Sequence, residues 1–428
     1  MPEVSLAVLG AGTVGTQVLR LLGQRADDLA ARAGAQLVVK AVAVRNLATP
    51  RPDFIDPALL TTDARAAMAG VDIVVELIGG IEPARSLVLA ALAQGSTVVT
   101  GNKALLAAHG PELYEAAAAS GADLYYEAAV AGAVPVVYAI RESLAGDRIT
   151  KILGIVNGTT NYILDEMTTK GLDFQEALAT AQQLGYAEAD PTADVDGHDA
   201  AAKAAILSSL AFHTRVASKD VPVTGIRHIT AADIAQARAD GYVIKLLASA
   251  ERHADGYDVR VEPRLVPLVH PLASVSGAFN AVVVESEAAG RLMFYGQGAG
   301  GAPTASAVLG DVVAAASHKV RGGNAPAELA YADLAALPPS RVRARRCLTI
   351  ELCDQPGQLA AVANILAGHD ISIDRVHQRP LAAQEGQPRA AVTIMTKAAT
   401  RAALDAAVTE LGSLAVRIIN VLTVEGND

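Results

Sequence analysis

Carboxylates and one lysine are concentrated in a short stretch of the chain, from Gly185 to Lys203. The stretch reads G-Y-A-E-A-D-P-T-A-D-V-D-G-H-D-A-A-A-K, so an acidic turn leads into an alanine-rich helix pattern. An α-helix repeats every ~3.6 residues, which places Asp199 and Lys203 on one face, one turn apart. Such a pair is either an exposed salt bridge or a catalytic couple that handles a proton.

The same acidic turn has two interpretations without catalysis. The residues D-V-D-G, ending at Gly197, match part of an EF-hand loop, but this alignment puts Lys203 at the twelfth position, where calcium requires a carboxylate. The sequence therefore argues against a calcium loop. A solvated acidic turn, whose aspartates interact with the positive N-terminus of a helix, remains the alternative.

A glycine-rich turn, G-A-G-T-V-G from Gly10 to Gly15, closes a strand pattern and opens a helix pattern. Gly10 permits the tight turn, Gly12 lets a pyrophosphate approach the backbone, and Gly15 allows close helix packing. This context predicts a dinucleotide site, with a purely structural turn as the alternative. The second strand pattern ends in V-A-V-R-N and offers Arg45 where NAD sites usually carry an acid, so NADP(H) is favoured and NAD(H) stays possible.

Another lysine, Lys103, follows the fourth strand pattern in the sequence T-G-N-K that begins at Thr100. Ligands of open α/β sheets bind at the carboxyl ends of the strands, where this lysine is expected. A single lysine is more often a solvated surface residue, so Lys103 gains meaning only if it lies near Lys203.

The elements that position these groups fall into an α/β arrangement of three parts. Residues 1–135 alternate strands and helices, which predicts a Rossmann-like, doubly wound parallel sheet. Residues 136–320 have longer helices and predict an inserted α+β domain, which the resemblance described below implies to be the substrate and dimerisation domain and from which the helix within 300–325 returns to the first sheet. The predicted strands are Val4–Gly10, Leu37–Val44, Val71–Leu77, Thr97–Thr100, Leu124–Glu127, Lys151–Val156, Asp258–Leu265 and Ala281–Glu287, and the clearest helices are Ala177–Leu184 and Ala200–Phe212.

The segment 336–346, A-L-P-P-S-R-V-R-A-R-R, predicts a linker, because paired prolines block regular structure and the arginines favour solvent. Residues 347–428 then show a βαββαβ pattern, which predicts a compact ferredoxin-like domain. Its predicted elements are Cys347–Cys353, Gln358–Gly368, Ile371–Gln378, Ala390–Thr396, Arg401–Leu411 and Val416–Val424.

Composition excludes several classes of function. The formal net charge is −10 and no basic run is interleaved with aromatic residues, so no nucleic-acid partner is expected. No run of ~18 strongly apolar residues suggests a membrane span, and the start of the chain lacks the basic region of a signal peptide, so we expect a cytoplasmic protein. The only cysteines, Cys347 and Cys353, fall six residues apart in one predicted strand, roughly 20 Å and beyond disulfide reach.

Taken together, the motifs resemble those of homoserine dehydrogenases that carry a C-terminal ACT domain. The resemblance runs in the family's motif order from about residue 4 to residue 320, and D-Q-P-G-Q-L from Asp354 matches the first strand-to-helix turn of an ACT domain. The other motifs are L-G-A-G-T-V-G, E-L-I-G-G (Glu76–Gly80), G-N-K-A-L (Gly101–Leu105), Y-E-A-A-V-A-G-A-V-P (Tyr126–Pro135), V-N-G-T-T-N-Y-I-L (Val156–Leu164), G-Y-A-E-A-D-P, D-G-H-D-A-A-A-K and G-A-G-G-A-P-T-A (Gly298–Ala305).

This resemblance implies the NAD(P)-dependent interconversion of L-homoserine and L-aspartate 4-semialdehyde in threonine, methionine and isoleucine biosynthesis, with threonine as a possible effector and a homodimer or homotetramer as the assembly. It makes Lys203 the proton-transfer group and Lys103 its partner. The substrate contacts are implied to be Glu188, Asp199 and, as a further candidate, Asp194. The implied nucleotide contacts are Gly10, Gly12, Thr13, Val14, Gly15, Arg45, Thr100, Lys103, Gly185 and Gly300. A Na⁺ or K⁺ site is implied at Glu127 with the backbone oxygens of Val130, Gly132 and Val134.

Proton transfer at a lysine requires a form without its proton, yet the expected neighbours act in opposite senses on the pKa of Lys203. Lys103 and an oxidised nicotinamide lower it, and Asp199 raises it. The sequence leaves the sign of the net shift open.

Three other functions are alternatives, and two of the implied sites have structural alternatives. Aspartate-semialdehyde dehydrogenase needs a nucleophilic cysteine, and both cysteines here lie in the C-terminal segment. Another Rossmann-fold amino-acid or hydroxy-acid dehydrogenase is possible, because fold alone does not determine substrate. An amino-acid sensor with an inactive enzyme half is a third, against which the intact Lys103 and Lys203 argue. Finally, the C-terminal domain could assist only dimerisation, and the turn after Glu127 could serve only packing.

Overall fold

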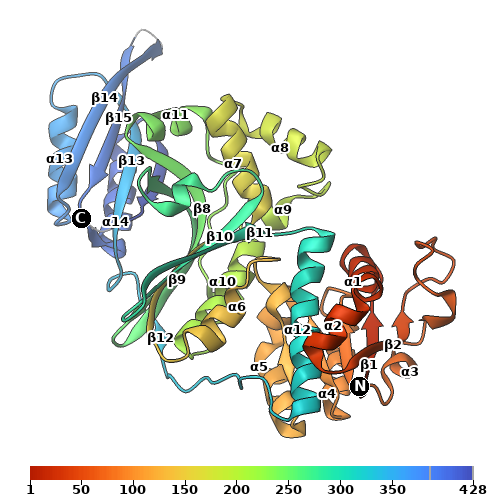
Figure 1. Cartoon of the computed structure of the whole chain (residues 1–428). Helices are drawn as coiled ribbons and strands as arrows, with labels where there is room; N and C mark the ends of the chain where they lie inside the picture. Colours follow the sequence, from red (N-terminus) through yellow and green to blue (C-terminus); the bar gives the residue numbers. More distant parts are fainter. Residues whose placement is uncertain (385–386, 427–428) are drawn as a thin grey trace.

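A six-stranded parallel sheet forms the N-terminal domain of the computed structural model, which describes residues 1–384 and 387–426 (Figure 1). Its strand order, β3-β2-β1-β4-β5-β6, confirms the predicted Rossmann-like sheet. The last predicted strand is two residues shorter than expected, because the chain enters a 3₁₀ turn at Glu127. The strands are β1 (Glu3–Leu9), β2 (Gln36–Ala43), β3 (Leu60–Thr61), β4 (Ile73–Glu76), β5 (Thr97–Thr100) and β6 (Leu124–Tyr125).

Helices cover this sheet, and one of them comes from a distant part of the sequence. The long helix α12 (Gly301–Arg321) packs on the first helix, α1 (Thr13–Gln24). Val308 and Val312 of α12 are buried in one apolar core with Leu6 of the sheet and Val18 of α1. The other helices of this domain are α2 (Ala26–Ala33), α3 (Ala64–Met68), α4 (Ala84–Ala93) and α5 (Lys103–Ser120).

The central domain places helices against an antiparallel sheet. The predicted strands near residues 151, 258 and 281 are present, and two further strands, β8 and β11, were not predicted. Helix α10 packs on β7, β8 and β9, so the Gly185–Lys203 stretch leads from the surface into the core of this domain. The elements are α6 (Val136–Tyr138), β7 (Ile149–Ile155), α7 (Gly158–Lys170), α8 (Phe174–Gln183), α9 (Thr192–Val195), α10 (His198–Phe212), α11 (Ala231–Ala239), β8 (Tyr242–His253), β9 (Gly256–Pro267), β10 (Phe279–Ser286) and β11 (Gly290–Gln297).

The C-terminal segment has the predicted βαββαβ order, with the strands arranged β17-β13-β15-β14 as in a ferredoxin-like sheet. Helices α13 and α14 lie together on one side of it (Figure 1). Its elements are β13 (Arg343–Cys353), α13 (Gln358–Gly368), β14 (Ile373–Gln384), β15 (Gln387–Thr396), β16 (Ala399–Thr400), α14 (Arg401–Leu414) and β17 (Arg417–Val424).

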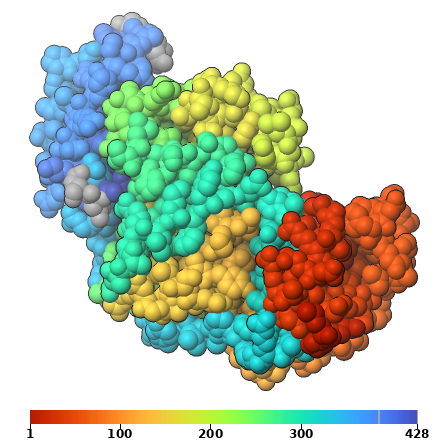
Figure 2. Space-filling view, viewed as in Figure 1, coloured from red at the N-terminus to blue at the C-terminus, as the bar shows by residue number. Residues whose placement is uncertain are grey.

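The C-terminal sheet is continuous with the central sheet, which the sequence did not predict. Strand β17 pairs in parallel with β9, through Thr423 opposite Arg264 and Val424 opposite Leu265. The result is an eleven-stranded sheet that includes two short strands, β12 (Ala335–Ala336) and β16. In the space-filling view the C-terminal segment (blue) and the N-terminal domain (red to orange) lie at opposite ends of the molecule (Figure 2).

Buried ion pairs reinforce this junction. The carboxylate of Glu425, directly after β17, accepts from Arg264 Nη1 at 2.6 Å and from Lys151 Nζ at 2.7 Å. Glu262 of β9 in turn pairs with Arg401, at the start of α14, at 2.8 Å. Charged groups on β7 and β9 therefore bind the C-terminal segment to the central domain.

The predicted linker 336–346 is shorter than expected. Strand β13 already begins at Arg343, and the side chain of Arg345 is buried. The expectation that the arginines keep this segment in solvent is therefore wrong for Arg345, because the residue belongs to a strand in the middle of the sheet. Within the residues that the structure describes, no helix is long and apolar enough to cross a bilayer.

Candidate active site

Helix α10 presents Asp199 and Lys203 one turn apart, as the sequence predicted, and buries both. The Lys203 Nζ donates to Asp199 Oδ2 at 2.7 Å, and the two side chains are 9% and 4% exposed. The helix begins after Gly197, whose φ of +87° suits glycine; a Cβ at this position would lie 2.8 Å from a methyl of Val223. The pair is thus not the exposed salt bridge that the sequence left open.

Two other segments converge on this pair. Lys103, the first residue of α5, forms an ion pair with Asp199 Oδ1, so the two lysines share one carboxylate. The carbonyl of Val156, directly after β7, accepts a second hydrogen bond from Lys203 Nζ at 2.6 Å. Asn157 donates through Nδ2 to Asp199 Oδ2 at 2.9 Å and to Asp194 Oδ1 at 2.6 Å. The cluster therefore joins the Rossmann-like domain to the central domain.

Burial and the shared carboxylate determine the charges in this cluster. Burial lowers the pKa of Lys203, the Asp199 carboxylate opposes that effect, and nearby Lys103 adds to it, so the net pKa lies below its ordinary value. Burial alone would raise the pKa of Asp199, but the Lys203 and Lys103 ammonium groups outweigh it and hold that pKa well below its usual range. The structure thus supplies the sign that the sequence left open: Lys203 is biased towards releasing its proton.

The other acids of the Gly185–Lys203 stretch separate into two groups. Asp194 is half-buried and joined to the cluster through Asn157. By contrast, Asp196 pairs with Arg227 at 2.5 Å, and Asp190 accepts from the backbone N–H of Thr192 at 3.1 Å. These two aspartates stabilise the turn. Glu188 is exposed, and among the described residues no hydrogen bond or ion pair joins its carboxylate to Asp199 or Lys203.

A cleft of about 710 Å³ lies at the carboxyl ends of β1, β2 and β4. Gly10 and Gly12 line it together with Arg45, as predicted for a nucleotide site. Gly10 has a φ of +105°, and a Cβ there would lie 2.7 Å from the Leu77 carbonyl, so glycine is required. A Cβ at Gly12 would meet no atom within 4 Å, so nothing in the chain itself demands that glycine.

The remaining predicted nucleotide residues are distributed unevenly around the cleft. Thr13 and Val14 begin α1, and Gly15 packs so closely that a Cβ on it would lie 2.0 Å from the Gly10 carbonyl. Gly300, with a φ of +121°, begins α12 next to the start of α1, since Gly301 lies against Thr13. The Thr100 hydroxyl is used within the chain, where it donates to Glu76 at 2.6 Å. Gly185, with a φ of +77°, lies in the exposed turn after α8 and does not line the cleft.

The turn implied as a cation site is buried, and the Glu127 side chain in it binds backbone N–H groups of the chain itself. Its two oxygens accept the backbone N–H groups of Val137 and Tyr138, at 2.9 and 2.7 Å, at the start of α6. Burial raises the pKa of Glu127 to about 7, although these hydrogen bonds oppose the shift. The Val134 carbonyl accepts from Val136 N, whereas among the described residues no N–H donates to the carbonyls of Val130 or Gly132. Backbone oxygens thus fit a cation better here than the carboxylate does.

Comparison with known proteins identifies the family. The family model for homoserine dehydrogenase matches residues 135–313, and the model for its NAD-binding domain matches residues 10–127. The homoserine dehydrogenase of Mycobacterium tuberculosis is 51% identical over 433 residues, which cover 99% of this chain and 98% of that protein. The chain belongs to the homoserine dehydrogenase family. It is therefore an oxidoreductase that acts on a CH–OH group.

Solved homoserine dehydrogenases share the fold. The crystal structure of the enzyme from Thiobacillus denitrificans superposes with a TM-score of 0.92 at 39% identity and covers 99% of each chain. A hyperthermophilic archaeal homoserine dehydrogenase, solved in complex with NADPH, has a TM-score of 0.64 at 26% identity and covers 76% of this chain and 99% of that one. The cleft between β1, β2 and β4 accordingly belongs to an NAD(P)-binding domain.

Three groups of this homoserine dehydrogenase site were missed by sequence reasoning. Asn157 lies within the quoted V-N-G-T-T-N-Y motif, and its position directly before α7 is typical of an N-cap; its Oδ1 indeed accepts from Thr160 N at 2.9 Å. The Val156 carbonyl left no signal, because any residue supplies a backbone oxygen. Arg51 lines the nucleotide cleft beside Arg45 and stood only six residues further along the sequence.

Proposed function

We propose that Lys203 transfers the proton of the substrate hydroxyl when L-homoserine and L-aspartate 4-semialdehyde are interconverted. The observation that carries this proposal is the environment of Lys203 Nζ. The ammonium group is buried and donates to Asp199 Oδ2 and to the Val156 carbonyl, and the pKa of Lys203 is lowered. A bound nicotinamide would accept or donate the hydride. During oxidation, Lys203 in its neutral form accepts the hydroxyl proton; during reduction, charged Lys203 returns it.

Asp199 orients both lysines in this proposal. It already binds Lys103, Lys203 and Asn157, so little of its acceptor capacity is left for a substrate ammonium group. Asp194 and exposed Glu188 are better placed for that role, since a half-buried carboxylate and a surface carboxylate are free to bind an ammonium. Lys103 stays 46% exposed and would then contact the substrate oxygen or carboxylate from the open side.

NADP(H) is the cofactor that the cleft favours. Arg45 and Arg51 both line it, and a guanidinium pairs well with a 2′-phosphate. Arg51 is held by three backbone carbonyls, those of Leu47, Thr49 and Asn46. Replacement of Arg45 by Ala should therefore lower kcat/KM for NADPH about tenfold or more and leave that for NADH nearly unchanged. Equal losses with both cofactors would remove Arg45 from phosphate recognition.

A monovalent cation, Na⁺ or K⁺, would bind the carbonyl oxygens of Val130 and Gly132. Val134 contributes in this proposal only if its carbonyl gives up its bond to Val136, and Glu127 shapes the turn through its bonds to α6. A hard ion with weak affinity suits neutral oxygen ligands. Titration of the purified enzyme with NaCl and KCl against a choline chloride control should raise its thermal unfolding temperature, and equal curves for all three salts would contradict the site.

The C-terminal domain is proposed to be an ACT domain that binds threonine. A cavity of about 400 Å³ is lined by Asp354, Gly357, Leu359 and Gln378, at the turn that the sequence motif indicated. A role limited to assembly as a homodimer or homotetramer is the alternative. Asp354→Asn should abolish inhibition by threonine without altering the uninhibited rate, and inhibition that persists in this variant would contradict the proposal.

The experiment that tests the proposed reaction is an assay of NADPH consumption by the purified full-length protein with L-aspartate 4-semialdehyde. We expect turnover, and we expect Lys203→Met to abolish it. A pure, folded wild-type protein without turnover would favour the sensor alternative.

A further inference from the structure

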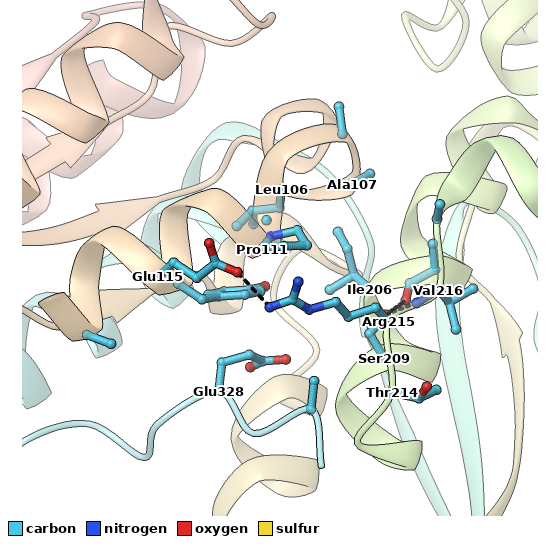
Figure 3. A pocket seen from close by; sticks show the side chains of 17 residues that line it. Leu106, Ala107, Pro111, Glu115, Ile206, Ser209, Thr214, Arg215, Val216 and Glu328 are labelled. Carbon is cyan, nitrogen blue, oxygen red and sulfur yellow. Dashed lines mark hydrogen bonds and ion pairs between the residues drawn. The ribbon is translucent and has the colours of Figure 1, made fainter. Parts of the chain in front are cut away.

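A second cavity, separate from the nucleotide cleft, lies between helices α5 and α10 (Figure 3). Its volume is about 330 Å³, within the range of ~300–1,000 Å³ that is usual for small-molecule sites. Aliphatic side chains line most of it, notably Leu106 and Pro111 of α5, Ile206 of α10 and Val216 of the loop after α10. None of its lining residues belongs to the sites proposed above.

One positive group spans this cavity. The side chain of Arg215 extends across it to Glu115 of α5, and the two form an ion pair at 2.8 Å (Figure 3). Both side chains are more than half exposed, at 59% and 67%. An exposed ion pair contributes little to stability, so a ligand carboxylate can replace Glu115 at low cost.

A second carboxylate, besides that of Glu115, lies on the opposite side of Arg215. The Glu328 carboxylate points into the cavity from the segment between α12 and β12 (Figure 3). Its Oε2 accepts from the Tyr126 hydroxyl at 2.9 Å, and Arg141 holds the same segment through the Pro326 carbonyl. Burial raises the pKa of Glu328, although the Tyr126 hydroxyl and Arg141 oppose the shift, and a cation beside this carboxylate would further favour its charged form.

We propose that this cavity binds a free α-amino acid with an aliphatic side chain. The carboxylate of the amino acid pairs with Arg215, its ammonium group with Glu328, and its side chain packs against Leu106, Ile206 and Val216. Each part of this ligand is complementary to one feature of the cavity lining. An amine alone would leave Arg215 without a ligand carboxylate, and an acid alone would leave Glu328 without a ligand cation.

The same two helices carry the catalytic cluster. Lys103 begins α5, and Asp199 and Lys203 lie in the first turns of α10. The Lys103–Asp199 ion pair therefore joins the N-terminal ends of the two helices between which the cavity lies further along the chain. An amino acid wedged between the helices is therefore positioned to affect that ion pair. The binding itself does not depend on the proposed catalytic roles, and the test measures binding alone.

The test is calorimetric titration of the full-length protein with L-leucine, with 3-methylbutylamine and 4-methylpentanoate as ligands that each lack one charge. We expect leucine to bind and each analogue to bind about tenfold more weakly or worse. Arg215→Gln and Glu328→Gln should each weaken leucine binding by at least about tenfold. Arg148→Gln is the matched control, because Arg148 pairs with Glu287 on the surface at 61% and 57% exposure and neither residue lines the cavity; this variant should bind leucine like the wild type.

Three results would overturn the proposal. The first is a wild-type protein that shows no leucine binding at millimolar concentrations. The second is unchanged binding in Arg215→Gln, whose exposed side chain can be replaced without disturbing the core and whose thermal unfolding is measured alongside. The third is leucine binding that L-homoserine or the Asp354→Asn substitution abolishes, since the ligand would then occupy the active site or the C-terminal domain.

Discussion

Two buried ion clusters in this molecule each hold a lysine, and the pKa values of the two lysines move in opposite directions. In the proposed active site, burial lowers the pKa of Lys203, and its ion-pair partner, Asp199, is shared with Lys103. At the junction of β7, β9 and β17, burial also disfavours charged Lys151, but Glu425 and Glu251, at 2.7 and 2.8 Å, outweigh it and raise the pKa. Lys203 shares its ion-pair carboxylate with a second lysine that lowers its pKa, whereas Lys151 has two ion-pair carboxylates that raise its own.

Lys245 shows that a lowered pKa is not sufficient for catalysis. Burial lowers its pKa to about 8, and its Nζ donates to two neutral groups, Asn161 Oδ1 at 3.0 Å and the Val275 carbonyl at 2.6 Å. It ties α7 to the loop before β10, and neither of these hydrogen bonds is to the Lys103–Asp199–Lys203 cluster. Lys203 differs because it lies beside Lys103, Asp194 and the domain that binds the nucleotide.

The largest expected effect separates the two clusters by activity. Lys203→Met should lower kcat about 10²–10⁴-fold, the usual range for loss of a general acid or base, and leave the affinity for NADPH unchanged. Steady-state kinetics and a fluorescence titration with NADPH measure the two quantities. Lys151→Met is the control at the other cluster and should keep kcat within about twofold at a temperature where the variant is folded; similar kcat losses in both variants would break the comparison.

The second prediction separates the clusters by stability. Glu425→Gln removes the carboxylate shared by Arg264 and Lys151 and should lower the free energy of unfolding by about 3 kcal/mol, because two buried cations lose one of their carboxylate partners. Thermal or urea unfolding checks this value. The control is Glu3→Gln, which removes the exposed Lys40–Glu3 pair and should cost less than about 0.5 kcal/mol. A loss of similar size in both variants would contradict the structural role of the junction.

Acid sensitivity gives the third prediction. Burial opposes ionisation of Glu425, but Arg264 and Lys151 outweigh it and lower the pKa to about 2. A carboxyl whose folded pKa is depressed contributes stability above its unfolded pKa, near 4.5, and loses that contribution as the pH falls towards 2. Urea unfolding at about pH 6 and about pH 3.5 should therefore show a smaller acid-induced loss in Glu425→Gln than in the wild type, and parallel losses would be the contrary result.

The smallest expected effect lies within the acidic stretch itself. Asp196→Asn removes an exposed pair with Arg227 and should change kcat and the unfolding temperature only slightly, with kcat within about twofold. Asp194→Asn, two residues earlier, should raise KM for homoserine clearly, since Asp194 is joined to the catalytic cluster through Asn157. Equal effects of the two substitutions on KM would contradict the different roles assigned to Asp194 and Asp196.

Much of the fold followed from local patterns in the sequence. Glycine spacing at Gly10–Gly15 and β-branched runs indicated the Rossmann-like sheet, because both signals depend on residues that are neighbours in the chain. Strands β8 and β11 were missed for a physical reason: β8 contains Lys245 and ends in the polar run Glu251–His253, and β11 is an edge strand whose residues are exposed or half-buried. The pairing of β17 with β9 joins residues about 160 positions apart, which no local pattern encodes.

The sequence predicted the charged residues of the candidate site but not the hydrogen bonds and charge interactions that connect them. The spacing of Asp199 and Lys203 sufficed to place them on one helix face, and the strand end sufficed for Lys103. The Val156 carbonyl and the net sign of the Lys203 pKa depend on which backbone atoms and charges meet in three dimensions. Arg345 shows the converse error, since a residue type that favours solvent can still be buried when its strand lies inside a sheet.

The central claim is that Asp199 and burial together set the pKa at which Lys203 exchanges its proton. The measurement that tests it most directly is the pH dependence of kcat/KM for homoserine oxidation in the wild type and in Asp199→Asn. Oxidation needs neutral Lys203, so the rate should rise with pH through a midpoint below the ordinary lysine value of 10.5. Because Asp199 favours charged Lys203, its neutralisation should move the midpoint of the residual activity to lower pH. A wild-type midpoint at or above 10.5, or an upward shift in Asp199→Asn, would contradict the account.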